Sequence, residues 1–209
     1  MALVLPTQAV SQLKMLLSIS IILLTGTAQA QIRYGVKAGV NFSTLKFSDD
    51  YAKKSSLIGY HAGVLMDVKI SDKFVFQPEV LFSTQGVKRK VEVRQNAEDQ
   101  FHSATLKTKI NYLNLDLMMK YYVIKKLDLE AGARIGLMLS AWNVLEVYRT
   151  ELNDVQPIDY GVNLGAGYDF TDHISVGVRY YYGLFNISKY SHDENVGNRV
   201  FGVSGVYKF

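Results

Sequence analysis

The feature that most constrains the fold is a strict alternation of apolar and polar residues, seen first in IRYGVKAGVNFST. Every second residue from Ile32 to Phe42 is apolar, and the residues between them are polar or glycine. A period of two is typical of a β-strand whose two faces meet different surroundings. The run is about twice as long as a common globular strand. It therefore predicts a long strand with one apolar face.

Similar alternation recurs along the chain, in eight segments. These are 32–43, 58–70, 74–83, 113–121, 127–139, 158–170, 174–184 and 201–209. Three pairs are joined by short turns, at 71–73, 124–126 and 171–173. Longer segments join the others, at about 46–56, 86–108, 143–156 and 185–198. This asymmetry is typical of outer-membrane barrels. The sequence predicts an all-β fold, an eight-stranded antiparallel up-and-down transmembrane β-barrel, with short turns in the periplasm and the longest loop extending its flanking strands.

The two faces of the strands distinguish a membrane barrel from a soluble one. A soluble lipocalin-like barrel would place its apolar residues inside and its polar residues outside. Here one face is aliphatic and aromatic, and the other carries glycine, amides and charges. Small side chains suit a narrow interior, and tyrosine suits a lipid interface. Because the strands also follow an export signal, we expect the apolar face to contact lipid, and a bilayer requires the sheet to close.

The export signal is read from the start of the chain. Lys14 precedes the apolar run MLLSISIILL, and TGTAQA follows with small residues at Ala28 and Ala30. This pattern predicts a signal peptide over 1–30, cleaved after Ala30, and a barrel domain over 31–209. The run is short for a transmembrane helix, which needs about 20 residues. A retained N-terminal anchor is the alternative, and both Met1 and Met15 are possible starts because 1–13 lacks a basic opening.

Composition excludes several classes of function. The net charge of +4 is mild and the basic residues are dispersed, so no nucleic-acid partner is expected. The absence of cysteine excludes disulfides and thiol nucleophiles. The glycines of GVNLGAG recur at strand spacing and open no helix, and His, Asp and Glu show no metal-ligand spacing. No cofactor and no metal site are therefore expected.

Charged residues on the polar face are the main candidate site. The predicted interior charge cluster consists of Lys37, Glu79, Lys120, Glu130, Arg134, Asp159 and Arg179, with His61, Asp67, Asp116 and Asp128 on the same face. An eight-stranded barrel is just wide enough for side chains to fill it. Opposite charges inside it should pair, because an isolated buried charge is very costly. We expect a salt-bridged plug centred on Glu79, Arg134 and Arg179; a narrow ion path lined by these residues is the alternative.

An enzyme is not expected. The histidines His61, His102, His173 and His192 and several serines are available, but none lies in a motif that resembles a nucleophile site. His61, on the inward face, is expected to hydrogen-bond a neighbour.

The last residues, FGVSGVYKF, carry apolar side chains at Phe201, Val203, Tyr207 and Phe209, with a gap at Gly205. A terminal phenylalanine preceded by alternating apolar residues resembles the signal that the outer-membrane barrel-assembly machinery reads. We expect this segment to be both the assembly signal and the strand that closes against the first.

Several segments resemble the outer-membrane β-barrel family of Bacteroidetes type, which includes the PorT-like proteins. They are YHAGVLMDVKI, FVFQPEVLFSTQG, INYLNLDLMMKYY, RYYYGLFNIS and GVYKF. The most specific are QPEVLFSTQG, which is similar to a family pattern Q-P-E-L-x-Y-S-x-x-G, and RYYYGLFNI. Asn114 and Asp116 depart from the Glu and Pro usual in the family. The resemblance covers 31–209 and implies an eight-stranded barrel whose relatives mostly lack an assigned activity.

The expected function is that of a non-enzymatic outer-membrane protein, structural or partner-binding through its loops. Its partners would be outer-membrane lipid, the barrel-assembly machinery during biogenesis, and an envelope or secretion-system protein. The alternatives are a small porin-like channel and, as the resemblance to PorT-like proteins implies, an accessory barrel of a secretion or gliding system. The sequence leaves the loop partner, ion conduction and the oligomeric state open.

Overall fold

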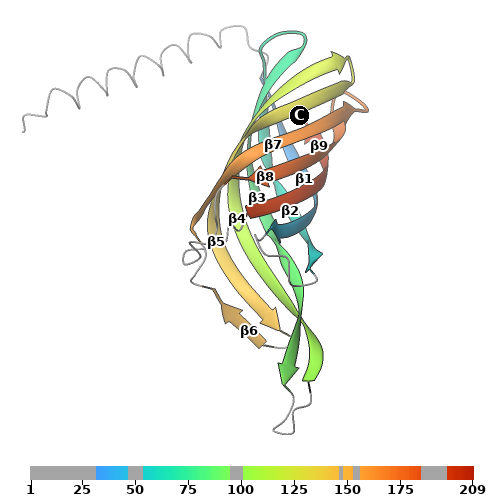
Figure 1. Ribbon diagram of the computed structural model, residues 1–209. Helices are drawn as coiled ribbons and strands as arrows, with labels where there is room; N and C mark the ends of the chain where they lie inside the picture. Colours follow the sequence, from blue (N-terminus) through green and yellow to red (C-terminus); the bar gives the residue numbers. More distant parts are fainter. Residues whose placement is uncertain (1–31, 47–53, 95–100, 146–147, 153–155, 185–196) are drawn as a thin grey trace, which may run out of the picture.

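The fold is seen in a computed structural model that describes residues 32–46, 54–94, 101–145, 148–152, 156–184 and 197–209 (Figure 1). The predicted signal segment 1–30 lies outside the described residues. No helix in these ranges is long and apolar enough to cross a membrane.

The described chain is built from antiparallel strands. They are β1 (Ile32–Lys46), β2 (Lys54–Lys69), β3 (Phe74–Arg94), β4 (Phe101–Ile124), β5 (Leu127–Leu145), β6 (Tyr148–Glu151), β7 (Ile158–Asp169), β8 (Ile174–Gly183) and β9 (Gly197–Lys208). Eight of them form a closed ring in the order β1, β2, β3, β4, β5, β7, β8, β9 and back to β1. The predicted eight-stranded antiparallel barrel is confirmed.

The ring closes where β9 pairs with β1. Their register runs from Gly35 opposite Lys208 to Lys46 opposite Gly197. Beyond the last paired residue, the Phe209 amide donates to the Tyr34 carbonyl at 2.9 Å. Closure satisfies the backbone groups of both edge strands, as a chain surrounded by hydrocarbon requires.

The two ends of the barrel differ in length. One end, called here the short-turn end, carries the β2–β3, β4–β5 and β7–β8 turns and also Ile32 and Phe209. The other, the hairpin end, carries the long extension of β3 and β4, whose pairing continues to Arg94 opposite Phe101. Figure 1 shows this green hairpin reaching well beyond the ring.

The strands at the hairpin end are longer than the apolar alternation indicated. The expected extension of the longest loop is confirmed, since most of 86–108 is strand. The prediction of a loop over 143–156 is wrong in part: β5 runs to Leu145, and β6 pairs with it. Beyond the apolar band neither face of a strand needs to be apolar, so the alternation of apolar and polar residues is lost there. The backbone hydrogen bonds between antiparallel strands do not depend on that alternation, and they continue.

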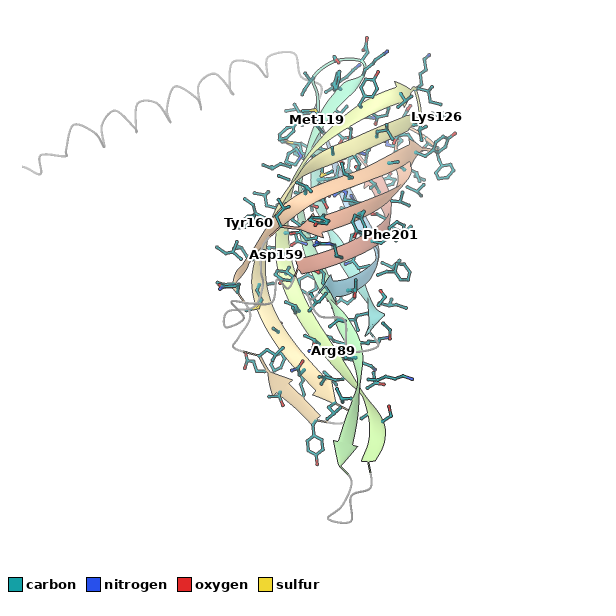
Figure 2. All side chains as sticks on the ribbon, in the orientation of Figure 1. Arg89, Met119, Lys126, Asp159, Tyr160 and Phe201 are labelled. Carbon is teal, nitrogen blue, oxygen red and sulfur yellow. The ribbon has the colours of Figure 1, made fainter. Side chains whose placement is uncertain are left out.

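The distribution of apolar and polar residues is inverted relative to a water-soluble barrel. Large apolar side chains from all eight ring strands are exposed on the outside, whereas charged and amide side chains are buried inside. Adjacent residues of β7 illustrate it: Tyr160 is 42% exposed and Asp159 is 2% exposed (Figure 2). The expectation that the apolar face points outward is confirmed. Such a surface is stable against lipid and unfavourable against water.

Candidate functional site

The centre of the interior is the Arg179 guanidinium, which projects inward from β8. Its Nη1 donates to Glu79 Oε2 at 2.9 Å and to Asp116 Oδ2 at 3.0 Å, and its Nε donates to Glu130 Oε1 at 2.7 Å. The three carboxylates come from β3, β4 and β5, none of which pairs with β8. The planar guanidinium has five donors in a fixed fork, which suits a site with several carboxylates.

Three further cations complete the balance of charge. Lys37 Nζ lies 3.2 Å from Glu79, and Arg134 forms a bidentate pair with Asp116 at 2.6 and 2.7 Å. Lys120 Nζ lies 3.5 Å from Asp128 and 3.8 Å from Glu130. Four cations therefore face four carboxylates, all of them nearly excluded from solvent.

Six of the seven residues predicted for the interior charge cluster belong to this one network: Lys37, Glu79, Lys120, Glu130, Arg134 and Arg179. Within the predicted centre, Arg179 contacts Glu79 directly, whereas Arg134 joins through Asp116. The seventh residue, Asp159, is also buried but lies in a separate group, where it accepts a hydrogen bond from Asn198 Nδ2 at 3.1 Å. The same asparagine donates to Gln85.

A second charged group closes the short-turn end. Lys208 Nζ lies 3.0 Å from Asp67 and 3.5 Å from Asp169, and the Tyr122 hydroxyl donates to Asp169 at 2.9 Å. Asp67 and Asp169 also line a cavity of about 280 Å³ at this mouth of the barrel. The inward position of Asp67 was predicted from the alternation, whereas that of Lys208 was not, although Lys208 alternates with the apolar Tyr207 and Phe209.

His61 lies in the middle of a row of hydrogen-bonded polar side chains. Its Nδ1 is 2.8 Å from Asn41 Oδ1, and its Nε2 is 3.2 Å from Ser204 Oγ. Asn41 Nδ2 donates to Ser83 Oγ at 3.0 Å, so the Asn41 oxygen faces the histidine. We therefore assign the proton to Nδ1, which leaves Nε2 to accept from Ser204. The expected hydrogen bonding of His61 is therefore present. The row runs from serine to histidine to amide, which is the order of a nucleophile, a base and an orienting group in a hydrolase.

Space beside this row is small. Asn41, His61 and Ser204 line a cavity of about 20 Å³, together with Arg134 and Arg179. A cavity of this volume accommodates about one water molecule. The row therefore has the hydrogen bonds of a hydrolytic triad without room for an acyl or phosphoryl substrate.

An apolar cluster fills the barrel at the hairpin end. It consists of Leu45, Val87, Ile110, Tyr112 and Ala141, with Met138 and Leu152 packed against it. This apolar cap was not predicted, because all of its residues except Met138 lie outside the eight predicted strand segments. The signal was present, since Ile110 and Tyr112 continue the inward period of β4.

Three residues of the predicted assembly signal lie on the outer face of β9, and the fourth, Phe209, directly follows this strand. Phe201, Val203, Tyr207 and Phe209 are each 39–66% exposed, and the rings of Tyr207 and Phe209 meet edge to face at 5.7 Å. Figure 2 labels Phe201 on this outer surface. Gly205, between them, has open space where a Cβ would stand.

A closed antiparallel ring with an apolar exterior and a polar interior defines the class of outer-membrane β-barrels. The sequence pattern of the outer membrane protein beta-barrel domain family matches residues 27–189. The chain belongs to that family, and its place is in the outer membrane. A search of curated protein sequences gave no significant match.

Solved structures share the fold at low sequence identity. Neisserial surface protein A is similar with a TM-score of 0.53 and 17% identity, covering 84% of this chain and 97% of that one. Ail, the attachment invasion locus protein of Yersinia pestis, has a TM-score of 0.43 and 11% identity in each of two structures. These matches cover 85% of this chain and 98% or 99% of that one. The outer membrane protease OmpT of Escherichia coli has a TM-score of 0.41 and 10% identity, and the match covers 86% of this chain and 94% of that one. At 17% identity, the likeness to Neisserial surface protein A concerns the fold alone.

Proposed function

We propose that this protein is a non-enzymatic outer-membrane barrel whose interior is a structural plug and whose hairpin end binds a partner outside the cell. The observation that carries the proposal is the filled interior. Successive levels hold the Lys208 pairs, the Arg179 network, the His61 row and the apolar cap. A barrel filled in this way acts through its surface.

The Arg179 network supports a plug more strongly than a conducting path. A path for ions needs sites that bind weakly enough for the ion to leave. Here each carboxylate of the network already has a cationic partner within 3.5 Å. The apolar cap adds a second barrier, because an ion crossing it would lose its hydration without a replacement.

The hairpin end supplies the surface for a partner. The paired extension of β3 and β4, flanked by β5 and β6, makes a wall of sheet beyond the ring. β6 is the last strand in the order of the sheet and is exposed along its length. An exposed strand edge can bind an extended segment of another protein through backbone hydrogen bonds.

The sidedness and route of export belong to the same proposal. The short-turn end would face the periplasm, since short periplasmic turns and long external loops are the rule in this class. A signal peptide cleaved after Ala30 would deliver the chain there. N-terminal sequencing of protein purified from outer membranes should begin at Gln31, and a start at Met1 or Met15 would contradict the cleavage.

Conductance in planar bilayers tests the plug. Purified protein should stay silent, because the interior offers no hydrated path. The alternative of a small porin predicts steady openings that are reduced by Glu79→Gln or by Arg134→Gln. Such openings, absent from a mock preparation in the same detergent, would overturn the plug.

Covalent labelling tests the absence of enzymatic activity. A serine with an activated hydroxyl reacts with a fluorophosphonate, and Ser204 is the serine that contacts His61. We expect no labelling of the folded protein. Ser83→Ala is the matched control, because Ser83 lines the same cavity. Labelling that survives Ser83→Ala and disappears in Ser204→Ala and in His61→Ala would establish a hydrolase.

The partner is tested by purification from detergent-solubilised outer membranes. In the matched variant, the residues between Lys90 and Thr105 are replaced by a short turn. Lys90 and Thr105 are opposite each other in the extension, so the ring is untouched. A partner retained by the full chain and lost from this variant would support binding at the hairpin end. If that partner is a secretion-system protein, the accessory role implied by the PorT-like resemblance gains support. A full chain that purifies alone would count against partner binding.

A further inference from the structure

The outer surface changes character where the barrel passes into the hairpin end. Phe82 and Leu113 are opposite each other on the apolar exterior. The next outward pair is polar: the Thr84 hydroxyl donates to Asn111 Oδ1 at 2.8 Å, and Asn111 Nδ2 donates to Ser140 Oγ at 3.0 Å. This row from β3, β4 and β5 marks the boundary between the apolar band and the surface beyond it.

Basic side chains follow immediately on the same outer face. We call them the outer basic patch: Lys88, Lys90, Lys107, Lys109 and Arg149. Those of β3 and β4 alternate with the inward Val87 and Thr108, which are buried, so they project to the opposite side of the sheet.

Two lysines of this patch lie directly opposite each other, and exposed Glu151 of β6 lies on the same face opposite Trp142. The register places Lys88 directly across from Lys107, and in the described part of the chain neither forms an ion pair. Like charges at directly opposed positions of a sheet are destabilising. The carboxylates of the Arg179 network point into the barrel, so they do not compensate this outer face. An external anion would relieve the repulsion.

An aromatic residue also lies at this level. Trp142 of β5 is opposite Lys109, and the Arg149 guanidinium lies 3.7 Å from the centre of the Trp142 ring. Tryptophan is enriched where the hydrocarbon meets the lipid headgroups. Lys109 is four residues beyond Leu113, which is about 10 Å above the apolar band for a tilted strand. Its flexible side chain can reach down to the headgroups.

We propose that the outer basic patch binds the phosphate groups of phosphorylated lipids in the leaflet around the hairpin end. The occupant is a lipid because the patch continues the lipid-facing surface of the same strands. Lys88, Lys107 and Lys109 neutralise the phosphates, and Trp142 rests beside them at the level of the headgroups. This inference needs only an inserted barrel, and it holds whether or not the interior conducts ions.

Lipid binding to purified, folded barrel tests the patch, with lipid A and dephosphorylated lipid A as probes. The test variant is Lys88→Gln/Lys107→Gln/Lys109→Gln. The matched control is Lys73→Gln/Lys125→Gln/Lys126→Gln, which removes the same charge from exposed residues at the short-turn end. We expect the test variant to lose affinity for lipid A about 100-fold, from roughly fivefold for each lysine near a charged surface. The control should retain its affinity.

Three outcomes would overturn the proposal. One is equal binding of lipid A by both triple variants, measured on protein that keeps its heat-modifiable mobility. Another is equal affinity of the native chain for lipid A and its dephosphorylated form. The third is full competition by inorganic phosphate at the concentration of the lipid, which would indicate a site for free anions.

Discussion

At the scale of single residues, Arg179 holds the interior together. It contacts acids from three strands that are distant in the sequence, at separations of 49, 63 and 100 residues. Its loss would leave Glu79, Asp116 and Glu130 close together with one cation fewer. The energetic weight lies less in the attraction itself than in the cost of an uncompensated buried charge.

Arg179→Gln should therefore lower the free energy of unfolding by about 3–5 kcal/mol, the usual cost of breaking a buried ion pair. Urea unfolding of the barrel in lipid vesicles measures it. Lys125→Gln is the control for loss of an exposed cation and should change stability little. A loss no larger than that of the control would show that the network does not carry stability.

Two glycines with opposite surroundings make a second comparison. A Cβ at Gly63 would collide with the Val80 carbonyl oxygen and lie 2.8 Å from Leu81 Cα, whereas a Cβ at Gly205 would meet nothing within 4 Å. Gly63→Ala should destabilise the barrel by about 1–3 kcal/mol through overpacking. Gly205→Ala should stay within about 0.5 kcal/mol. Vesicle unfolding of both variants tests this, and equal effects would contradict it.

At the scale of elements, β9 is the strand whose assembly completes the barrel. It pairs with β1 and β8 along its length, and its outward residues form part of the lipid-facing surface. The predicted role of its last residues as an assembly signal stays a prediction. The structure adds a physical reason for it, since the Phe209 amide makes the last hydrogen bond of the closing seam.

Deletion of Phe209 should lower the amount of assembled barrel in the outer membrane and leave export unchanged. Heat-modifiable mobility measures assembly, and removal of the signal peptide measures export. Phe170→Ala is the control, because Phe170 is a similarly exposed aromatic at the same short-turn end. Normal levels of heat-modifiable protein after the deletion would exclude the role.

At the scale of the whole molecule, the outer surface orders the barrel along the membrane normal. The apolar band, the Thr84–Asn111–Ser140 row and the outer basic patch follow one another on the same strands. The chain has one tryptophan, and it lies just beyond that polar row. Its fluorescence therefore reports how deep the hairpin end sits.

Trp142 should be quenched more strongly by lipids brominated close to the headgroup than by lipids brominated near the chain end, because it lies beside the basic patch. The double variant Trp142→Phe/Leu164→Trp is the reference, since Leu164 is 61% exposed near the middle of β7. It should show the reverse order. Deeper quenching of Trp142 than of the reference tryptophan would mean that the hairpin end lies within the hydrocarbon.

Sequence by itself determined the class of fold and the two faces of each strand. Alternation at a period of two is a property of each strand by itself. A strand that separates lipid from a packed interior needs an apolar side chain at every second position. For that reason the sequence predicted the eight ring strands. It also predicted the inward position of eleven residues, ten of them charged and the eleventh His61. The length of β3 and β4 could not be predicted, because beyond the bilayer pairing no longer requires an apolar face.

Only the tertiary structure decided which of these inward residues meet. Arg179 pairs with Glu79, 100 residues away, and Ser204 reaches His61, 143 residues away, because ring closure and strand register set their levels. The same register separated Asp159 from the charge cluster, brought Lys208 to Asp67 and placed Lys88 opposite Lys107. Alternation states the side of the sheet that a residue faces. Its height in the barrel and its partner there follow from the stagger between strands, which no single strand encodes.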